Sequence, residues 1–571
     1  MNEHLVTHLV DEIARITGLS ADEIKGYVET PPRPEMGDFA LPCFKLAKSM
    51  RKPPKAIAED LAKKLKPGKG IARIEAAAGY LNIFLDKAAV TTGVLEKVLA
   101  EAYGKVAKKA AAPVVVEYSS PNIAKPFGVG HLRSTVIGNS IARLYETAGY
   151  QVVRLNYPGD WGTQFGMLLA LWTEEGRGDP AQADIKEVLD VYVRANKLDE
   201  SDEGFAKRAR EYFKKLEEGD HSAKGLWESF RKKSLGEFQR VYDILGVDAF
   251  DASDGEASIA MHPEKVEYAV QEASKRGLAV RSEGALVVDL SAYDMPPLML
   301  RKTDGTSTYH TRDLATIMER WEKHKFEKIF YVVGQDQKLH FKQLFKTVEL
   351  MGFDWASRCI HVDFGMIRFG GGKMSTRGGN VVFLEDLLAD VVNEVRGIVA
   401  ENNPELDGAA AEDISRKVAT GAIVFEDLRR KRIKDVEFDR ERALSLTGDT
   451  GPYLQYSHAR LAGILRKARE AGVDWRGYDP TQLKAPEETA LIDKLGQFEE
   501  QASRATEQTE PSIVAGYLLE LAGEFNGFYV ACKVIGVEKT VEKARLALVE
   551  ATKRVLKQGL YLLGIGAPER M

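Results

Sequence analysis

One segment in the first third of the chain constrains the fold more than any other. It begins with the β-branched run Val114 to Tyr118, which suits a strand buried inside a parallel sheet. A turn with glycine at positions 128 and 130 follows, and Val152 to Leu155 resumes the pattern of a strand. Between them, apolar residues recur near one helical stripe: Leu132, Val136, Ile141, Leu144, Tyr145 and Ala148. The sequence therefore predicts a β-α-β unit.

The rest of the chain divides into regions of different character. With 571 residues it exceeds what one hydrophobic core usually serves, so we expect about two to four domains. Residues 286–290 and 329–333 again resemble strands, whereas residues 170–260 are charge-dense and helical. From Phe383 onward the apolar spacing is helical, as in Ile513, Tyr517, Leu518, Leu521 and Phe525. These patterns predict an α/β nucleotide-binding fold with a long helical insertion, followed by an all-α bundle.

Composition narrows the class of protein. The chain has 80 Lys and Arg against 85 Asp and Glu, a net charge of −5, which excludes a uniformly basic nucleic-acid binder but not a local basic face. Cys43, Cys359 and Cys532 lie far apart, which argues against a zinc ribbon, a redox pair or a disulfide framework. The first residues lack the pattern of a signal peptide, and no apolar run could span a bilayer. We expect a cytoplasmic protein with no membrane partner.

The glycine turn before the predicted helix carries the first candidate ligand-binding residues. Gly128 and Gly130 allow a ligand to approach the backbone closely, and the helix start offers free N–H groups to phosphate. His131 follows directly, where its imidazole can donate to an oxygen. Because such turns punctuate many α/β folds, a purely structural turn is the alternative interpretation.

A second basic loop lies more than two hundred residues later in the chain. Three glycines at 370–372 precede Lys373, Met374 and Ser375, and Arg377 follows. The two cations could close on a pyrophosphate as negative charge develops there. An isolated loop of this kind would more simply be a solvated basic surface.

The strings around both loops resemble the arginyl-tRNA synthetase family of class I. The resemblance rests on residues 120–134, on Gly159 to Gly166 and on residues 373–377, in that order along the chain. Members of the family usually have a histidine at the position of Gly128, so of the usual histidine pair only His131 is present. Lys125 could supply some of the missing positive charge. The departure favours an adjusted site over an inactive one.

The resemblance implies a fold, an activity and a set of site residues. The expected architecture is an N-terminal α+β domain that binds the tRNA elbow with its linker (1–110), a Rossmann-like catalytic domain (111–382) with a helical insertion at about 170–285, and a helical anticodon-binding domain (383–571). The expected activity is ATP-dependent formation of arginyl-adenylate, followed by transfer of arginine to tRNA(Arg). The implied catalytic residues are His131, Lys373, Arg377 and Lys125, and the implied ATP-binding residues are Gly128, Gly130, His131, Lys373, Met374 and Ser375. Mg²⁺ would arrive with ATP, without a protein metal site.

A guanidinium substrate needs carboxylate or carbonyl acceptors, because arginine carries five donors and stays charged. Asp313 could pair with it while Tyr309, four residues earlier on a predicted helix, packs beside it. The resemblance implies that Glu117, Asn122 and Gln337 contact arginine as well. Taken alone, Asp313 could equally be a helix-start carboxylate or a partner of Arg312, and His340 is expected to be structural.

Besides the N-terminal domain, two further parts of the chain are candidates for contacts with RNA. The dense basic run 429–434 suits phosphate binding, although a solvated face would have the same composition. Tyr453 and Tyr456 lie close to Arg460, a combination that can stack unpaired bases, although both tyrosines could be core residues of a helix. The family is usually monomeric, so we expect a monomer whose partners are tRNA(Arg), L-arginine and ATP.

Two other functions fit part of this pattern. A non-catalytic tRNA-binding paralogue is suggested by glycine at position 128. A different adenylate-forming or nucleotidyl-transferring enzyme could share the histidine turn. Such an enzyme would have no use for the N-terminal module or for nearly two hundred helical residues at the C-terminus, roughly the size of a whole domain.

Overall fold

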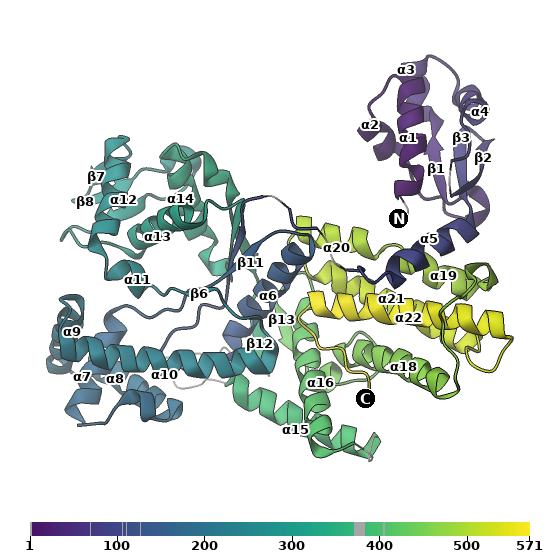
Figure 1. Cartoon of the computed structure of the whole chain (residues 1–571). Coiled ribbons are helices and arrows are strands. Elements are labelled where there is room, and N and C mark those ends of the chain that lie inside the picture. Colours follow the sequence, from purple (N-terminus) through teal and green to yellow (C-terminus); the bar gives the residue numbers. More distant parts are fainter. Residues whose placement is uncertain are drawn as a thin grey trace. The chain divides into compact units, whose positions relative to one another are not determined.

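The computed structural model describes residues 3–68, 70–104, 107–109, 111–125, 127–369, 383–402 and 406–571. Its contacts group the chain into two compact units (Figure 1). The first unit contains residues 1–103, 460–501 and 517–556, and the second contains residues 104–459, 502–516 and 557–571. Each unit is described by itself below.

The first unit contains an antiparallel sheet in the order β1-β3-β2. A capping box at Ser20 begins the second helix, because Ser20 and Glu23 satisfy each other's backbone N–H groups. The sheet and the helices of residues 3–99 are α1 (Glu3–Thr17), α2 (Ala21–Tyr27), β1 (Phe39–Pro42), α3 (Ala47–Met50), α4 (Pro54–Lys64), β2 (Ile71–Ala77), β3 (Tyr80–Leu85) and α5 (Lys87–Leu99). β3 contains the apolar run Leu81 to Leu85, which is interrupted only by Asn82.

The second unit is built on a parallel sheet. Among the described residues, five strands pair in the order β11-β10-β4-β5-β6. Their bounds are β4 (Val114–Glu117), β5 (Val152–Asn156), β6 (Ala252–Ser253), β10 (Lys328–Gly334) and β11 (Cys359–Phe364). The predicted β-α-β unit is confirmed, since α6 (Leu132–Thr147) connects β4 to the parallel neighbour β5.

The order of these strands fixes where a ligand can bind. The chain continues from β4 to β5 on one side, whereas β10 and β11 lie on the other side of β4. The connections therefore diverge between β4 and β10. In open parallel sheets, ligands bind outside the carboxyl ends of the strands at such a switch point. Glu117 ends β4 and Gly334 ends β10, so the residues that follow them border the expected site.

Four helices follow β5 before a short strand interrupts the helical region. The four helices are α7 (Thr163–Glu174), α8 (Ile185–Ser201), α9 (Glu203–Glu217) and α10 (His221–Leu245), and the long α10 lies against the other three (Figure 1). We expected helical sequence to about residue 285. Instead the chain returns to the main sheet at β6, whose two residues are too few to give a strand pattern.

A smaller antiparallel sheet and three helices come next. The strand expected at 286–290 is present, but it pairs in this separate sheet rather than in the parallel one. The elements are α11 (Ala257–Ala260), α12 (Pro263–Lys275), β7 (Ala279–Ser282), β8 (Ala285–Val288), β9 (Leu298–Arg301), α13 (Tyr309–His324) and α14 (Lys338–Leu350). Leu314 and Ile317 of α13 are fully buried in one core with Ile329 of β10 and Leu344 of α14. Burial of such side chains stabilises α13 beside the sheet by about 1.5–3 kcal/mol each.

The C-terminal part is mostly helical, as expected, with one short exception. β12 (Ile367–Phe369) pairs in parallel with β13 (Val436–Phe438). The helices are α15 (Leu384–Asn402), α16 (Gly408–Leu428), α17 (Arg440–Ala443), α18 (Gly451–Glu470), α19 (Pro486–Leu495), α20 (Phe498–Glu507), α21 (Ser512–Ala531) and α22 (Lys539–Leu562). β13 has three residues, which again are too few for a sequence pattern.

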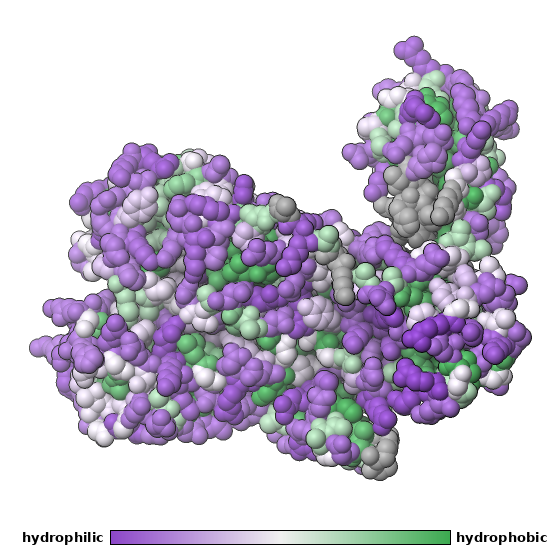
Figure 2. Space-filling model, in the orientation of Figure 1, coloured by the Kyte–Doolittle hydropathy of each residue, from purple (hydrophilic) through white to green (hydrophobic). Residues whose placement is uncertain are grey.

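The surface is mainly polar. Hydrophilic residues cover most of the visible face, with small scattered apolar areas (Figure 2). In the part of the chain that the structure describes, no helix has the length and apolar character needed to cross a membrane.

Candidate active site

The turn after β4 is held in an unusual backbone conformation. Ser119 and Ala124 have φ values of 57° and 63°, in the left-handed region that side chains other than glycine rarely adopt. Each is fixed by a side chain from elsewhere: the Ser134 hydroxyl accepts from the Ser119 N–H at 2.9 Å, and the Ser234 hydroxyl accepts from the Ala124 N–H at 2.9 Å. Such strain costs about 1–3 kcal/mol per residue and clusters at functional sites.

Asn122 lies in this turn beside the segment that follows β5. The Gly159 N–H donates to the Pro121 carbonyl at 3.0 Å, and the Ile123 N–H donates to the Gly159 carbonyl at 3.1 Å. A Cβ on Gly159 would stand 2.2 Å from Asn122 Oδ1, so any other residue at 159 would displace the Asn122 side chain. Asn122 itself is exposed. The two strings noted in the sequence are thus brought into contact.

His131 stands at the end of the turn, directly before α6. It is partly buried, and its Nδ1 has no hydrogen-bond partner within the protein. Burial, reinforced by the nearby charge of Lys125, lowers the pKa of His131 to about 4. The imidazole is therefore neutral at pH 7. The Lys125 ammonium lies 4.5 Å from the ring centroid of Tyr192 in α8.

The two glycines before His131 differ in what they allow. Gly130 is exposed, and a Cβ built there meets no atom within 4 Å. Gly128 is buried and has φ −84° and ψ 158°, an extended conformation open to any residue. Glycine at 128 is therefore not required by the backbone angles, and the expected close approach of a ligand at this position stays a prediction.

Arg133 connects the start of α6 to the segments on both sides of the second motif. Its guanidinium pairs with Asp427 at 2.9 Å, and both side chains are 1% exposed. It also donates to the carbonyls of Gly365, Lys434 and Arg432 at 2.7–3.1 Å. On the far side of the motif, the Leu384 N–H donates to the Phe127 carbonyl at 3.1 Å.

The second motif itself falls outside the described residues. The residues expected there are Lys373, Met374, Ser375 and Arg377, all within the interval between residues 369 and 383. The anchors at Gly365 and Leu384 fix the flanking segments against the turn that carries His131.

Asp313 is presented near the start of α13. Its carboxylate pairs with His340 Nε2 at 2.8 Å and keeps a side-chain exposure of 31%. It is therefore not the cap of the helix, a role that Thr308 takes, and its ion pair is with His340 rather than with Arg312. Tyr309, one turn earlier, is 53% exposed and lies beside His340 with ring centroids 5.3 Å apart.

Glu117, at the end of β4, is in a different environment. It is 4% exposed and forms an ion pair with Arg320 of α13. Burial raises the pKa of Glu117, Arg320 lowers it, and the negative charge of Asp313 raises it again. The Arg320 guanidinium lies 4.8 Å from the ring centroid of Tyr157 and 5.5 Å from that of Tyr331.

Arg320 was missed in the sequence, although a signal was available. Tyr309, Asp313, Thr316 and Arg320 are spaced by four, three and four residues, which places them on one helical face. Asp313 also contributes to the raised pKa values of Tyr157, Tyr309 and Glu256, the last reaching about 7 mainly through burial. The region around this face is therefore anionic.

Gln337 follows β10 in a short 3-10 helix, three residues before His340. Its side chain is exposed and donates to the Asp336 carboxylate at 3.1 Å. A cavity of about 530 Å³ borders α13 on another side and is lined in part by Arg312, Glu217 and Trp161. Its volume lies in the range of small-molecule sites.

The basic run 429–434 is largely engaged within the protein. Arg429 and Arg430 both pair with Glu426, and Arg432 pairs with Asp363 at 2.8 Å. Lys431 and Lys434 are exposed. Much of the run is therefore structural, which favours neither a purely solvated face nor a continuous phosphate-binding surface.

The residues expected to contact RNA are in α18. Tyr453 and Tyr456 are partly buried in the second unit. Arg460 belongs to the first unit, where it donates to the Asn526 side chain at 3.3 Å and lies 5.0 Å from the ring centroid of Tyr529.

Three family models match the chain in succession. They are "Arginyl tRNA synthetase N terminal domain" at residues 3–85, "tRNA synthetases class I (R), catalytic domain" at residues 94–440 and "DALR anticodon binding domain" at residues 454–571. The catalytic-domain model alone covers more than half of the chain.

Complete relatives agree with these matches. The arginine–tRNA ligase of Clostridium perfringens is 44% identical over 567 residues, 99% of each chain, and that of Clostridioides difficile is 43% identical over 561 residues, 98% of each. Among solved structures, the arginyl-tRNA synthetase of Thermus thermophilus matches with a TM-score of 0.81 and 30% identity, over 95% of this chain and 96% of that one. The chain therefore belongs to the arginyl-tRNA synthetase family of class I.

Proposed function

We propose that the protein is an arginine–tRNA ligase that uses ATP to form arginyl-adenylate and then transfers arginine to tRNA(Arg). The observation that carries the proposal is the carboxylate of Asp313, held by His340 beside the exposed Tyr309 and close to the switch point of the sheet. A carboxylate fixed in this way matches a guanidinium, which binds carboxylates through paired charge-assisted hydrogen bonds.

In the first step, the carboxylate of arginine attacks the α-phosphorus of ATP and pyrophosphate leaves. The neutral His131 would donate an N–H to a phosphate oxygen, a role supported by its low pKa and by the lack of a protein partner at Nδ1. The open space at Gly130 leaves room for the nucleotide. Lys125, together with Lys373 and Arg377, would balance the developing negative charge.

The remaining predicted residues are assigned either to the ATP site or to the arginine site. Gly128, Met374 and Ser375 would complete the ATP site, and Glu117, Asn122 and Gln337 would complete the arginine site. Mg²⁺ would be held through phosphate oxygens and water. In the second step, a hydroxyl of the 3′-terminal ribose attacks the acyl carbon and AMP leaves.

The proposal also covers the partners and the domains. We place the elbow-binding domain with its linker at 1–110, the catalytic domain at 111–382 and the anticodon-binding domain at 383–571, with Tyr453, Tyr456 and Arg460 contacting tRNA. We further propose that the protein acts as a monomer in the cytoplasm.

The test combines two assays on purified protein. Arginine-dependent exchange of pyrophosphate into ATP, with and without tRNA, measures activation, and attachment of labelled arginine to tRNA(Arg) measures transfer. Both should occur with arginine and neither with lysine. Folded protein that attaches no arginine to its tRNA would overturn the proposal.

Gly128 supports one competing function, a tRNA-binding protein without catalysis. This alternative predicts tRNA affinity in the absence of arginine-dependent exchange. Gly128→His is the informative variant, because the φ and ψ of residue 128 accept any side chain. Exchange that appears only in this variant would favour the non-catalytic alternative for the natural chain.

A further inference from the structure

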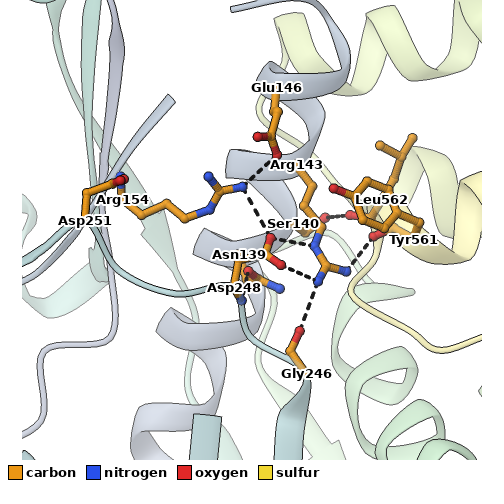
Figure 3. Close-up of polar contacts among 10 residues, drawn as sticks. All are labelled: Asn139, Ser140, Arg143, Glu146, Arg154, Gly246, Asp248, Asp251, Tyr561 and Leu562. Carbon is orange, nitrogen blue, oxygen red and sulfur yellow. Dashed lines mark hydrogen bonds and ion pairs between the residues drawn. The ribbon is translucent and has the colours of Figure 1, made fainter. Parts of the chain in front are cut away.

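The C-terminal residues contact the end of α6 that is distant from His131 (Figure 3). The Ser140 hydroxyl donates to the Leu562 carbonyl at 2.7 Å, and Arg143 Nη1 donates to the Tyr561 carbonyl at 2.9 Å. Ser140 is fully buried and Arg143 is 8% exposed. None of these residues has a part in the chemistry proposed above, so their burial needs another explanation.

The contacts meet α22 where the helix stops. Gly564 has φ 79°, its N–H donates to the Tyr561 carbonyl, and the Ile565 N–H donates to the Leu560 carbonyl. This is a Schellman ending, which satisfies some of the last carbonyls of a helix. Ser140 supplies a partner for the Leu562 carbonyl, and a Cβ at Gly564 would lie 3.2 Å from Asn139 Nδ2. The terminus of α22 is thus fitted closely to α6.

Arg143 joins this ending to a third element. Its Nε and Nη2 bind the two carboxylate oxygens of Asp248 at 2.8 Å each, and Nη2 also donates to the Gly246 carbonyl at 3.0 Å (Figure 3). Gly246 directly follows α10. The planar guanidinium therefore links α6, the end of α10 and the end of α22, a geometry that lysine cannot reproduce.

The residues after α22 contact α18, and α18 in turn contacts α16. Gln455 of α18 donates to the Gly566 carbonyl and to the Lys417 carbonyl of α16, both at 2.8 Å. His458 Nδ1 donates to the Pro568 carbonyl at 2.8 Å. Asp427, also in α16, pairs with Arg133 near the start of α6. A closed circuit of contacts thus holds α6 at both ends.

We propose that Arg143 is a positioning residue for His131, and that residues 561–568 act as the support against which it fixes α6. The proposal rests on the proposed function. Arg143 and His131 are about 18 Å apart along the helix axis. A helix moves as a stiff rod, so a shift at Arg143 is carried to the turn that holds His131. Misplacement of a reacting group by about 1 Å can lower a rate about 100-fold.

The variant that tests this is Arg143→Lys, which keeps the positive charge near Asp248 but loses the fork that reaches Tyr561 and Gly246. The matched control is Arg154→Lys. Arg154 has the same side-chain exposure of 10% and contacts Glu146 and the same Asp248, but no dashed line joins it to Tyr561 or Leu562 in Figure 3. Turnover is expressed per active site after titration with a burst of adenylate formation, so loss of folded protein alone does not change it.

For Arg143→Lys we expect kcat of pyrophosphate exchange to fall about tenfold, with KM for arginine and ATP within about twofold of the natural values, as expected when an interaction needed in the transition state is lost. Ser140→Ala should act in the same direction, and Arg154→Lys should leave kcat within about twofold. Equal losses in Arg143→Lys and Arg154→Lys, or an unchanged kcat in Arg143→Lys, would overturn the proposal.

Hydrogen–deuterium exchange supplies a readout that does not depend on the reaction. Peptides covering residues 127–138 should exchange faster in Arg143→Lys than in the natural chain, and unchanged in Arg154→Lys. Unaltered protection in Arg143→Lys contradicts the positioning role. If the natural protein attaches no arginine to tRNA while this difference in exchange is present, the proposed function fails and the support of α6 stands.

Discussion

The two halves of the candidate site carry opposite charge. At the start of α6, His131 has Lys125 as its charged neighbour and stays neutral because protonation there is unfavourable. Beside one face of α13, the negative charge of Asp313 raises the pKa of the nearby Glu117. Burial and the charge of Asp313 raise the pKa of Glu256 to about 7. An anionic ligand end suits the first half and a cationic end suits the second.

The two carboxylates of the anionic half differ in their exposure and in their ion-pair partners. Glu117 is buried against Arg320, so its charge is already compensated within the protein. Asp313 retains exposed surface and has a histidine as its partner. We therefore expect Asp313 to determine affinity for a guanidinium and Glu117 to determine mainly the stability of the site.

The largest effect is expected from Arg320→Met. It leaves the Glu117 carboxylate buried without a partner, which typically costs about 3–5 kcal/mol. We expect Tm, measured by scanning fluorimetry at pH 7, to fall by roughly 2–5 °C, because the entropy of unfolding grows with chain length.

The control for this variant is the double change Glu117→Gln with Arg320→Met, which removes both charges. It should recover most of the lost Tm, because no unpaired ion remains buried. A single variant as stable as the natural chain would show that Glu117 is not held by Arg320, and the contrast with Asp313 would disappear.

Asp313→Asn should have the next largest effect, on binding rather than on stability. Loss of a charged acceptor for the guanidinium costs about 3 kcal/mol, which corresponds to about a 100-fold loss in kcat/KM for arginine. Tm should change little, because the side chain is partly exposed. Steady-state pyrophosphate exchange over a range of arginine concentrations measures it.

Glu319→Gln is the matched control for Asp313→Asn. Glu319 is a partly exposed carboxylate of the same helix and pairs with Lys265 at 2.6 Å. It should leave kcat/KM unchanged. If Asp313→Asn behaves like this control, the anionic half does not select the substrate.

The sequence predicted the first half of the site better than the second. The strands Val114 to Tyr118 and 329–333, and the helix between the first two strands, follow from β-branched runs and helical spacing, and they place the histidine turn correctly. Asp313 and Glu117 were both identified, but their partners were not, because an ion pair between β4 and α13 depends on tertiary packing. The left-handed angles at Ser119 and Ala124 were also missed, since neither residue is one that usually signals them.

The lowered pKa of His131, in the cationic half, should make the stability of the protein depend on pH. The pKa of His131 is about 4 in the folded protein and about 6.5 when unfolded, so the unfolded state binds more protons as pH falls below 6.5. Stability is therefore lost between about pH 6.5 and 4, by about 2 kcal/mol at pH 5. His310, whose pKa burial also lowers to about 4, contributes in the same direction.

The measurement compares Tm at pH 7 and pH 5 in the natural chain and in His131→Gln. The loss between the two pH values should be smaller in the variant, because one of the histidines with a lowered pKa has been removed, and His310→Gln provides the parallel case. An identical loss in the natural chain and in His131→Gln would mean that His131 is not buried in its neutral form.

The smallest effect is expected from His340→Gln, which tests how the exposed carboxylate is held. His340 Nε2 contacts Asp313 at 2.8 Å from α14, so it supports the carboxylate. Loss of this polar contact is expected to cost about 1 kcal/mol, or about a fivefold rise in KM for arginine. We expect kcat to stay within about twofold, because we propose that the phosphates of ATP bind in the other half of the site. A fall in kcat with unchanged KM would instead assign His340 to the chemical step. The two halves would then not separate phosphate binding from guanidinium binding.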